Sequence, residues 1–369
     1  MRIFVDTLSL NAALSTVIKA LPIRTTVSIL EGIYMKAAGG RLLLRCTDLN
    51  IQIETLIDAT IEEEGAIVLP GRLFSEMVKR LPGEMTSLDV KKNTAEIISG
   101  SFKTTLQGEN AADYHAMSDV NQDSVISLKP GALKEMVKGC IFAAAQDDSK
   151  PILTGALLEL KEGEATLIAL DGYRLALRRI ALEGGKSVNA NLVVPARSLL
   201  EVSRILPDGD EAVSIGFSKT HLVADAGNTR ITARLMEGEF IKYRQILPES
   251  HTTRVRVNRK ELLDGIERVA LMAREGKSNL IKFTISTNKI AITANSEIGR
   301  SNEEMEVNLI GEELEIAFNS KYFSDVLKVL EDEEIYLDMN NNISPCVVRP
   351  IQGEMYYYLI LPVRLFTGM

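Results

Sequence analysis

The chain contains no tryptophan, three cysteines and three histidines among its 369 residues. Cys46, Cys140 and Cys346 lie far apart in apolar surroundings, so they predict buried thiols in a reducing cytosol rather than a disulfide framework. No apolar run approaches the ~18 residues that a membrane helix requires. The N-terminal segment MRIFVDTLSL has no long apolar stretch and no small-residue cleavage site, so we expect no signal peptide.

Sequence patterns of known catalytic chemistry are also missing. EGGKS and REGKS resemble the end of a phosphate-binding loop, but Ile180 and Leu271 stand where that loop requires its first glycine. The isolated histidines and single cysteines give no zinc spacing, and there is no Gly-x-Ser-x-Gly turn. The sequence therefore predicts no catalytic residue, no metal and no cofactor.

A threefold internal repeat, with a period near 123 residues, is the main positive feature of the sequence. LPGRLFSEMVKRLP (69–82) returns as VPARSLLEVSRILP (194–207) and again as FNSKYFSDVLKVLE (318–331). A second helical pattern, with apolar residues at i, i+4, i+7 and i+8, also occurs three times, starting at Leu10, Leu133 and Leu262. These patterns predict six helices, over 6–20, 71–81, 129–145, 195–206, 258–274 and 319–330.

Runs of alternating residues follow each predicted helix and indicate strands. In the first repeat they flank Gly39-Gly40, which favours a hairpin. Each third of the chain thus has the order helix, strands, helix, strands, which predicts an α+β fold of antiparallel sheets with helices on one face. Polar joints near 121–124 and 249–253 predict three similar domains, at 1–121, 122–250 and 251–369.

Basic residues concentrate on the predicted helices. The six segments hold fifteen lysines and arginines and eight acidic residues, although the whole chain has a net charge of −8. Three aligned positions share one helix face: Arg72, Glu76 and Lys79; Arg197, Glu201 and Arg204; Lys321, Asp325 and Lys328. The opposite face of the first copy is apolar and contains Leu73, Phe74, Met77, Val78 and Leu81. The charged face is either a solvated surface with ion pairs or a surface for phosphates of duplex DNA, bound without regard to sequence.

Several segments resemble one protein family, the bacterial DNA polymerase sliding clamps, which are the beta subunits of the DNA polymerase III holoenzyme. They are PILTGALLEL (151–160), DGYRLA (171–176), VVPARSLLEVSRIL (193–206), YRQILP (243–248) and LILPVRL (359–365). The resemblance spans all three repeats. It implies three clamp domains per chain and two chains that close head to tail into a ring lined by helices. It also implies a processivity factor without an active site, which encircles double-stranded DNA and tethers the replicative polymerase. The expected location is the bacterial cytoplasm, at the nucleoid.

Candidate DNA-binding residues come from two sources. The resemblance implies that Arg24 and Gln146 contact DNA. The geometry of the helix faces adds Arg72, Lys79, Lys138, Arg197, Arg204, Lys321 and Lys328. For each lysine or arginine taken alone, a solvated surface role remains the alternative.

The resemblance further implies a hydrophobic groove for peptides of the DNA polymerase catalytic subunit, the clamp loader and other clamp-binding proteins. Its candidate residues are Leu153, Gly172, Tyr173, Arg174, Leu175, Pro248, Ile343, Leu359, Leu361, Pro362, Val363 and Arg364. The alternation in YYYLILPV equally fits strand core for Leu359 and Leu361. Residues 366–369 (FTGM) extend beyond the usual Arg-Leu ending of the family, either over the groove or free of it.

The same resemblance implies a homodimer joint. It sets Leu271 and Met272 of the third domain against Phe102, Lys103 and Leu106 of the first. Glu303, Glu304 and Glu306 would meet Lys103 or Arg80 across this joint, or would simply decorate an exposed surface. The alternative to a clamp is an enzyme or small-ligand protein built from triplicated domains.

Overall fold

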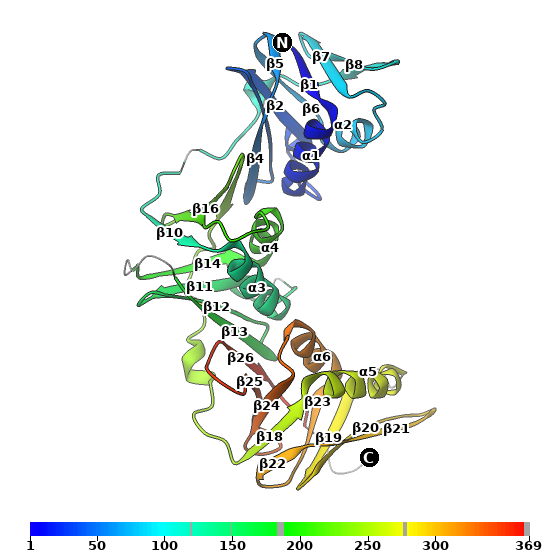
Figure 1. Cartoon of the computed structure of the whole chain (residues 1–369), viewed down its shortest axis with the longest axis vertical. Helices are drawn as coiled ribbons and strands as arrows, with labels where there is room; N and C mark the ends of the chain where they lie inside the picture. The colour runs from blue at the N-terminus through cyan, green and yellow to red at the C-terminus, as the bar shows by residue number, and fades with distance from the viewer. Residues whose placement is uncertain (119, 148, 183–187, 276–278, 365–369) are drawn as a thin grey trace. The chain divides into compact units, whose positions relative to one another are not determined.

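The computed structural model describes residues 1–118, 120–147, 149–182, 188–275 and 279–364. The chain divides into two compact units, Met1–Gly131 with Glu201–Leu235, and Ala132–Leu200 with Met236–Met369. Each unit contains two sheets, and neighbouring strands are antiparallel. The structure is therefore of the predicted α+β class (Figure 1).

The first unit contains a five-stranded sheet and an eight-stranded sheet. The smaller one has the spatial order β5 (Thr60–Glu63), β1 (Arg2–Asp6), β7 (Met85–Lys91), β8 (Thr94–Ser99), β9 (Phe102–Gln107). The larger one has the order β10 (Ser124–Leu128), β15 (Val213–Phe217), β16 (His221–Ala226), β17 (Thr229–Arg234), β4 (Ile51–Asp58), β3 (Arg41–Thr47), β2 (Gly32–Ala38), β6 (Gly65–Pro70).

The second unit contains a nine-stranded sheet and a four-stranded sheet. The larger one has the order β14 (Ala190–Pro195), β11 (Gly155–Lys161), β12 (Glu164–Leu170), β13 (Arg174–Ala181), β26 (Tyr356–Ile360), β25 (Cys346–Pro350), β24 (Glu334–Met339), β18 (Thr253–Asn258), β22 (Asn308–Gly311). The smaller one has the order β21 (Gly299–Glu306), β20 (Lys289–Ser296), β19 (Leu280–Ser286), β23 (Leu314–Asn319).

All six predicted helices are present. They are α1 (Thr7–Val17), α2 (Gly71–Val78), α3 (Pro130–Cys140), α4 (Ala196–Ile205), α5 (Arg259–Glu275) and α6 (Ser320–Val329). Short 3-10 turns cover Ile18–Ala20, Ser28–Glu31, Ala111–Asp113, Ile141–Ala143, Pro151–Thr154 and Tyr243–Ile246. Within the second unit, α5 and α6 pack against each other, and α5 lies on β19–β21 (Figure 1).

Polar side chains at the ends of the preceding strands cap the N-termini of helices α1 and α6. The Asp6 carboxylate accepts a hydrogen bond from the backbone N of Ser9, and the Asn319 side chain accepts one from the N of Lys321. Both cap amides that would otherwise lack a partner. The helix predicted to reach residue 81 ends at Val78. Its last turn tightens to i,i+3 bonds before Pro82, because a residue preceding proline disfavours helical geometry.

Three further sequence predictions can be compared directly with the structure. The Gly39-Gly40 hairpin is confirmed, with φ of +59° and +78° at the turn between β2 and β3, values that suit glycine. All three cysteines are free and buried, and burial raises the pKa of each thiol. The apolar face predicted for the first copy is only partly buried. Leu73 is 55% exposed, because it lies at the edge of the stripe whose centre is Phe74.

Strand pairing joins successive repeats into continuous sheets. Strand β4 of the first repeat pairs with β17 of the second, and β13 of the second pairs with β26 of the third. In both joints the first residue of one strand lies opposite the fifth residue of the other. The corresponding strands β21 and β9 are edge strands of their own sheets within the described chain. The repeat therefore leaves two strand edges without a partner strand in the described chain, β9 in the first unit and β21 in the second.

Candidate functional site

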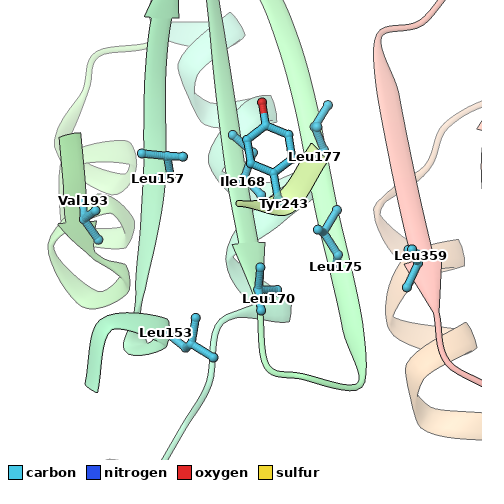
Figure 2. Close-up of a cluster of buried hydrophobic side chains, with 9 residues drawn as sticks. All are labelled: Leu153, Leu157, Ile168, Leu170, Leu175, Leu177, Val193, Tyr243 and Leu359. Carbon is cyan, nitrogen blue, oxygen red and sulfur yellow. The ribbon is translucent and has the colours of Figure 1, made fainter. Parts of the chain in front are cut away.

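The groove leucines form one row across neighbouring strands of the nine-stranded sheet. Leu170 on β12 lies opposite Leu175 on β13, and Leu175 lies opposite Leu359 on β26. Directly opposed residues share a face of the sheet, so these side chains are in contact range. A second row two residues along the strands contains Val193, Leu157, Ile168, Leu177 and Tyr357. Most of both rows belongs to one buried cluster (Figure 2).

Three of the groove candidates form the floor of this cluster. Leu153, Leu175 and Leu359 are at most 4% exposed, as strand-core side chains would be. Leu153 comes from the 3-10 turn before β11, and its carbonyl accepts a hydrogen bond from the backbone N of Ala145. For Leu359, the structure thus agrees with the strand-core interpretation, while Leu361 is 36% exposed and lies at the surface.

The segment before the third repeat covers part of this floor. Tyr243 is buried in the cluster, with Met236, Phe240 and Leu247 packed against it. Its hydroxyl donates to a Glu159 carboxylate oxygen at 2.9 Å, and burial together with this bond raises the pKa of Tyr243 to about 12. Burial alone would raise the pKa of Glu159, but hydrogen bonds from Arg244 and Tyr243 outweigh it and lower that pKa. The paired charges hold the segment on the sheet.

Exposed apolar side chains occur on the segments that adjoin the floor. They are Tyr173, Ile246, Leu361 and Val363, whereas Ile343 is exposed on the turn between β24 and β25. Two backbone bonds fix the chain end here: the N of Leu361 donates to the Tyr173 carbonyl, and the N of Val363 donates to the Ala317 carbonyl, each at 2.8 Å. Pro248 is half-buried, and its carbonyl accepts from the Tyr357 hydroxyl at 3.5 Å. Pro362 is half-buried and Arg364 is exposed, whereas residues 366–369 lie outside the described residues.

Arg174 is a charged groove candidate, yet it is only 6% exposed and its donors are occupied. Its guanidinium donates to Asp171 at 3.0 Å, to Asp325 of α6 at 2.6 Å and to the Phe142 carbonyl at 2.7 Å. It supports the turn around Gly172, where φ is +94°, instead of presenting charge at the surface. Asp171 completes this turn by accepting from the backbone N of Tyr173.

Tyr322 is a rim residue that the sequence pattern did not identify. Its ring stacks on Tyr173, with centroids 6.1 Å apart and planes inclined by 25°, and Arg174 lies 4.7 Å from its centroid. Tyr322 aligns with Leu73 of the apolar face predicted for the first copy, so no signal marked it as a rim residue. Ile246 was also missed, because an isolated apolar residue near a turn carries no periodicity.

The corresponding positions of the first joint are polar. Thr47 lies opposite Gln52, and Gln52 lies opposite Thr232, where the second joint has three leucines. The Gln52 side chain also accepts a hydrogen bond from the backbone N of Met117 at 2.8 Å. This bond fixes the segment between β9 and β10, which carries Met117, to strand β4. Of these two joints, only the second therefore presents an apolar row.

The nine DNA-binding candidates are all exposed, and most of the charged ones have acidic partners. Lys79 pairs with Glu76, Arg204 with Glu201, Lys321 with Asp325, Lys328 with Glu267 and Lys138 with Glu331. The Arg72 guanidinium donates to the Pro22 carbonyl at 3.2 Å, in the loop that also carries Arg24. Gln146 lies just after α3 and its 3-10 turn. The helix faces thus carry mixed charge that is mostly paired.

The joint candidates lie on the two edge strands or beside them. Phe102 and Leu271 are exposed, at 39% and 62%, whereas Leu106 is buried and Met272 half-buried. Four of the charged residues proposed to meet across the joint have partners within the chain: Lys103 pairs with Glu96, Glu303 with Arg268, Glu304 with Lys289 and Arg80 with Glu76. An ion pair across the joint that uses one of these four would replace its internal pair.

Among the described residues, no group of three or more His, Cys, Asp or Glu side chains is arranged to hold a metal ion. None of the helices in the described ranges has the length and apolar character needed to span a membrane.

Comparison with known proteins assigns the family. Models of the DNA polymerase III beta subunit match over residues 1–118 (N-terminal domain), 127–242 (central domain) and 244–364 (C-terminal domain). The beta sliding clamp of Bacillus subtilis is 35% identical over 362 residues, covering 95% of this chain and 96% of that protein. The beta sliding clamp of Staphylococcus aureus (strain Mu50) is 32% identical over 368 residues, covering 96% of each.

Solved structures show the same relationship. The crystal structure of the DNA polymerase sliding clamp from Bacillus subtilis matches with a TM-score of 0.97 and 34% identity, covering 99% of this chain and 100% of that chain. The DNA polymerase III beta subunit from Thermotoga maritima matches with a TM-score of 0.92 and 30% identity over the same shares. The chain therefore belongs to the bacterial DNA sliding clamps, the non-catalytic beta subunits of DNA polymerase III that act in DNA replication.

Proposed function

We propose that two copies of this chain close head to tail into a ring around duplex DNA, with β9 of each copy paired to β21 of the other. The observation that carries this proposal is the repeated joint. Strands β4 and β13 each pair with the matching strand of the next repeat, and β21 is the third member of that series. Its partner in the series would be β9, whose outer edge is free within the described chain. An unpaired edge favours pairing with another strand.

The two observed joints also supply a register for the proposed one. Thr229, the first residue of β17, lies opposite Thr55, the fifth residue of β4. The same rule sets Phe102 opposite the partner's Glu303, and Leu106 opposite the partner's Gly299. In this arrangement the exposed Phe102 and Leu271 lose contact with water. A C2 dimer then has two identical joints and a closed ring.

The joint can be tested by native mass. Leu271→Asp puts a charge into an apolar contact without an opposite charge, and we expect the wild-type dimer to become a monomer. The matched control is Ile310→Asp, which introduces the same charge at another exposed aliphatic residue, 58% exposed on β22. A persistent dimer mass after Leu271→Asp would contradict this joint.

We infer that the basic helix faces meet DNA through weak and exchangeable contacts. Exposed ion pairs such as Lys79 with Glu76 contribute little to stability, so a phosphate can replace the carboxylate at small cost. Contacts of this kind depend on salt but not on base sequence. Enclosure by the ring retains the DNA, while Arg24, Gln146 and the helix residues supply attraction. This combination permits sliding.

We infer that the apolar rim and floor around Tyr173, Leu175 and Leu361 bind extended peptides of partner proteins. An exposed apolar patch over a rigid sheet, with a few fixed polar groups, suits anchor side chains of an extended segment. The polymerase catalytic subunit, the clamp loader and other clamp-binding proteins would compete for it. We further propose domain boundaries at 1–121, 122–250 and 251–369, and a location in the bacterial cytoplasm at the nucleoid.

A further inference from the structure

Two of the strongly exposed aliphatic side chains lie in different units, at related positions of the repeat. Leu73 on the first turn of α2 is 55% exposed, and Ile298 in the turn between β20 and β21 is 75% exposed. Burial of such side chains against another apolar surface is favourable, because it removes apolar area from water.

The internal repeat relates these two residues to a contact that is present in the chain. Tyr322 is the third residue of α6, as Leu73 is the third residue of α2, and each helix directly follows a strand, β23 or β6. Tyr173 is the last residue before β13, as Ile298 is the last residue before β21. Tyr173 and Tyr322 stack with ring centroids 6.1 Å apart. Leu73 and Ile298 therefore occupy the same two places in the repeat.

Pairing of β13 with β26 accompanies the tyrosine contact. The third repeat provides Tyr322, and the second provides both β13 and the turn that carries Tyr173. If β21 pairs with the partner's β9 in the same register, the turn with Ile298 approaches the partner's α2 in the same way. The inference thus rests on the joint proposed above and adds a contact to it.

A cavity of about 410 Å³ lies beside Leu73 and can receive an aliphatic side chain. Its apolar lining includes Leu21, Pro22 and Ile23, and Ile23 is 80% exposed. Gly71 packs closely in this lining, since a Cβ there would lie 2.7 Å from the Glu31 carbonyl oxygen and 2.8 Å from Leu21.

We propose that Ile298 of one copy packs against the partner subunit's Leu73 at the mouth of this cavity, as an apolar contact that stabilises each joint of the ring. The occupant is a second copy of this chain. Continuity with the strand joint and the repeated position of the tyrosine pair select it over a peptide or another protein.

Cross-linking between separately labelled copies tests the contact. Leu73→Cys protein is mixed with Ile298→Cys protein and treated with a short bis-maleimide. The three natural cysteines are fully buried and do not react, so a product of twice the chain mass reports this pair. Val125→Cys, also at an exposed apolar residue, replaces Leu73→Cys in the control mixture. We expect at least tenfold more product from the first mixture. Equal yields would overturn the proposal.

Replacing the two apolar residues by opposite charges provides the second measurement. Ile298→Asp should raise the dimer dissociation constant about tenfold or more, and Leu73→Lys in the same chain should restore most of the loss. Both side chains are exposed in the single chain, so neither change disturbs its fold. Unchanged dimerisation of Ile298→Asp, or no recovery in the double variant, would contradict the contact.

The joint itself is checked separately. A Phe102→Cys copy cross-linked to a Glu303→Cys copy reports the strand pairing alone. Product from that pair without product from Leu73→Cys and Ile298→Cys overturns only the present inference. Absence of both products, with a monomer mass for the unaltered chain, overturns the joint as well.

Discussion

The guanidinium of Arg174 lies 2.6 Å from the carboxylate of Asp325 and joins the turn before β13 to helix α6. The residues belong to different repeats, and Arg174 lies 4.7 Å from the ring centroid of Tyr322, which stacks on Tyr173. Arg174 is nearly inaccessible, so its charge is used inside the protein. The pair thus fixes the turn that carries Tyr173 relative to helix α6.

Arg174→Met is therefore expected to lower the free energy of unfolding by about 3 kcal/mol, because Asp171 and Asp325 lose a shared, buried partner. Denaturant titration measures this. Arg179→Met removes a more exposed arginine from its pair with Glu354 and should change stability by only about 0.5 kcal/mol. Equal effects of the two substitutions would show that Arg174 does not hold the turn.

The same pair predicts an acid dependence. Burial would raise the pKa of Asp325, but hydrogen bonds from Lys321 and Arg174 outweigh it and lower the pKa below 3.8. A carboxyl with a depressed pKa in the folded state stabilises the protein above its unfolded value, and this contribution is lost as pH falls through the folded value. Below about pH 4, wild-type stability should fall more steeply than that of Asp325→Asn. If stability fell with pH equally in the wild type and in Asp325→Asn, the depressed pKa of Asp325 would be contradicted.

The peptide groove predicts a selective loss of binding. Leu361→Asp places a charge at the rim and should weaken binding of a labelled peptide from the polymerase catalytic subunit at least tenfold, because the apolar anchor then meets a solvated carboxylate. Fluorescence anisotropy measures the affinity, and native mass checks that the dimer remains. Ile310→Asp on β22 is the matched control and should leave peptide affinity unchanged. Full affinity in Leu361→Asp would remove the groove assignment.

Both the threefold repeat and the helix positions could be predicted from sequence, since each helix keeps its apolar spacing and its flanking strand. The residues that form the groove rim could not be predicted from sequence. Leu359 and Leu361 are two residues apart and look alike in the alternation, yet one is buried beside Leu175 and the other is exposed. Pairing between distant strands decides this difference, and no local pattern encodes it. The partners of Arg174 could not be predicted for the same reason, because Asp325 lies 151 residues away.

The helix surface predicts a change in salt dependence. Replacing Lys79, Arg204 and Lys328 together by glutamine should weaken DNA binding and flatten the slope of log affinity against log salt by about one unit for each lost contact. The matched control replaces their partners Glu76, Glu201 and Glu267 by glutamine, which frees the cations and should strengthen binding. An unaltered slope in the first variant would mean that these side chains do not meet phosphate.

Retention on DNA of different topology tests the encircling ring most directly. Copies loaded onto a nicked circular plasmid should stay bound through gel filtration at moderate salt, and linearising the plasmid with a restriction enzyme should release them by sliding off the ends. Equal retention on circular and linear DNA would contradict enclosure and would indicate that the chain grips DNA by contact alone.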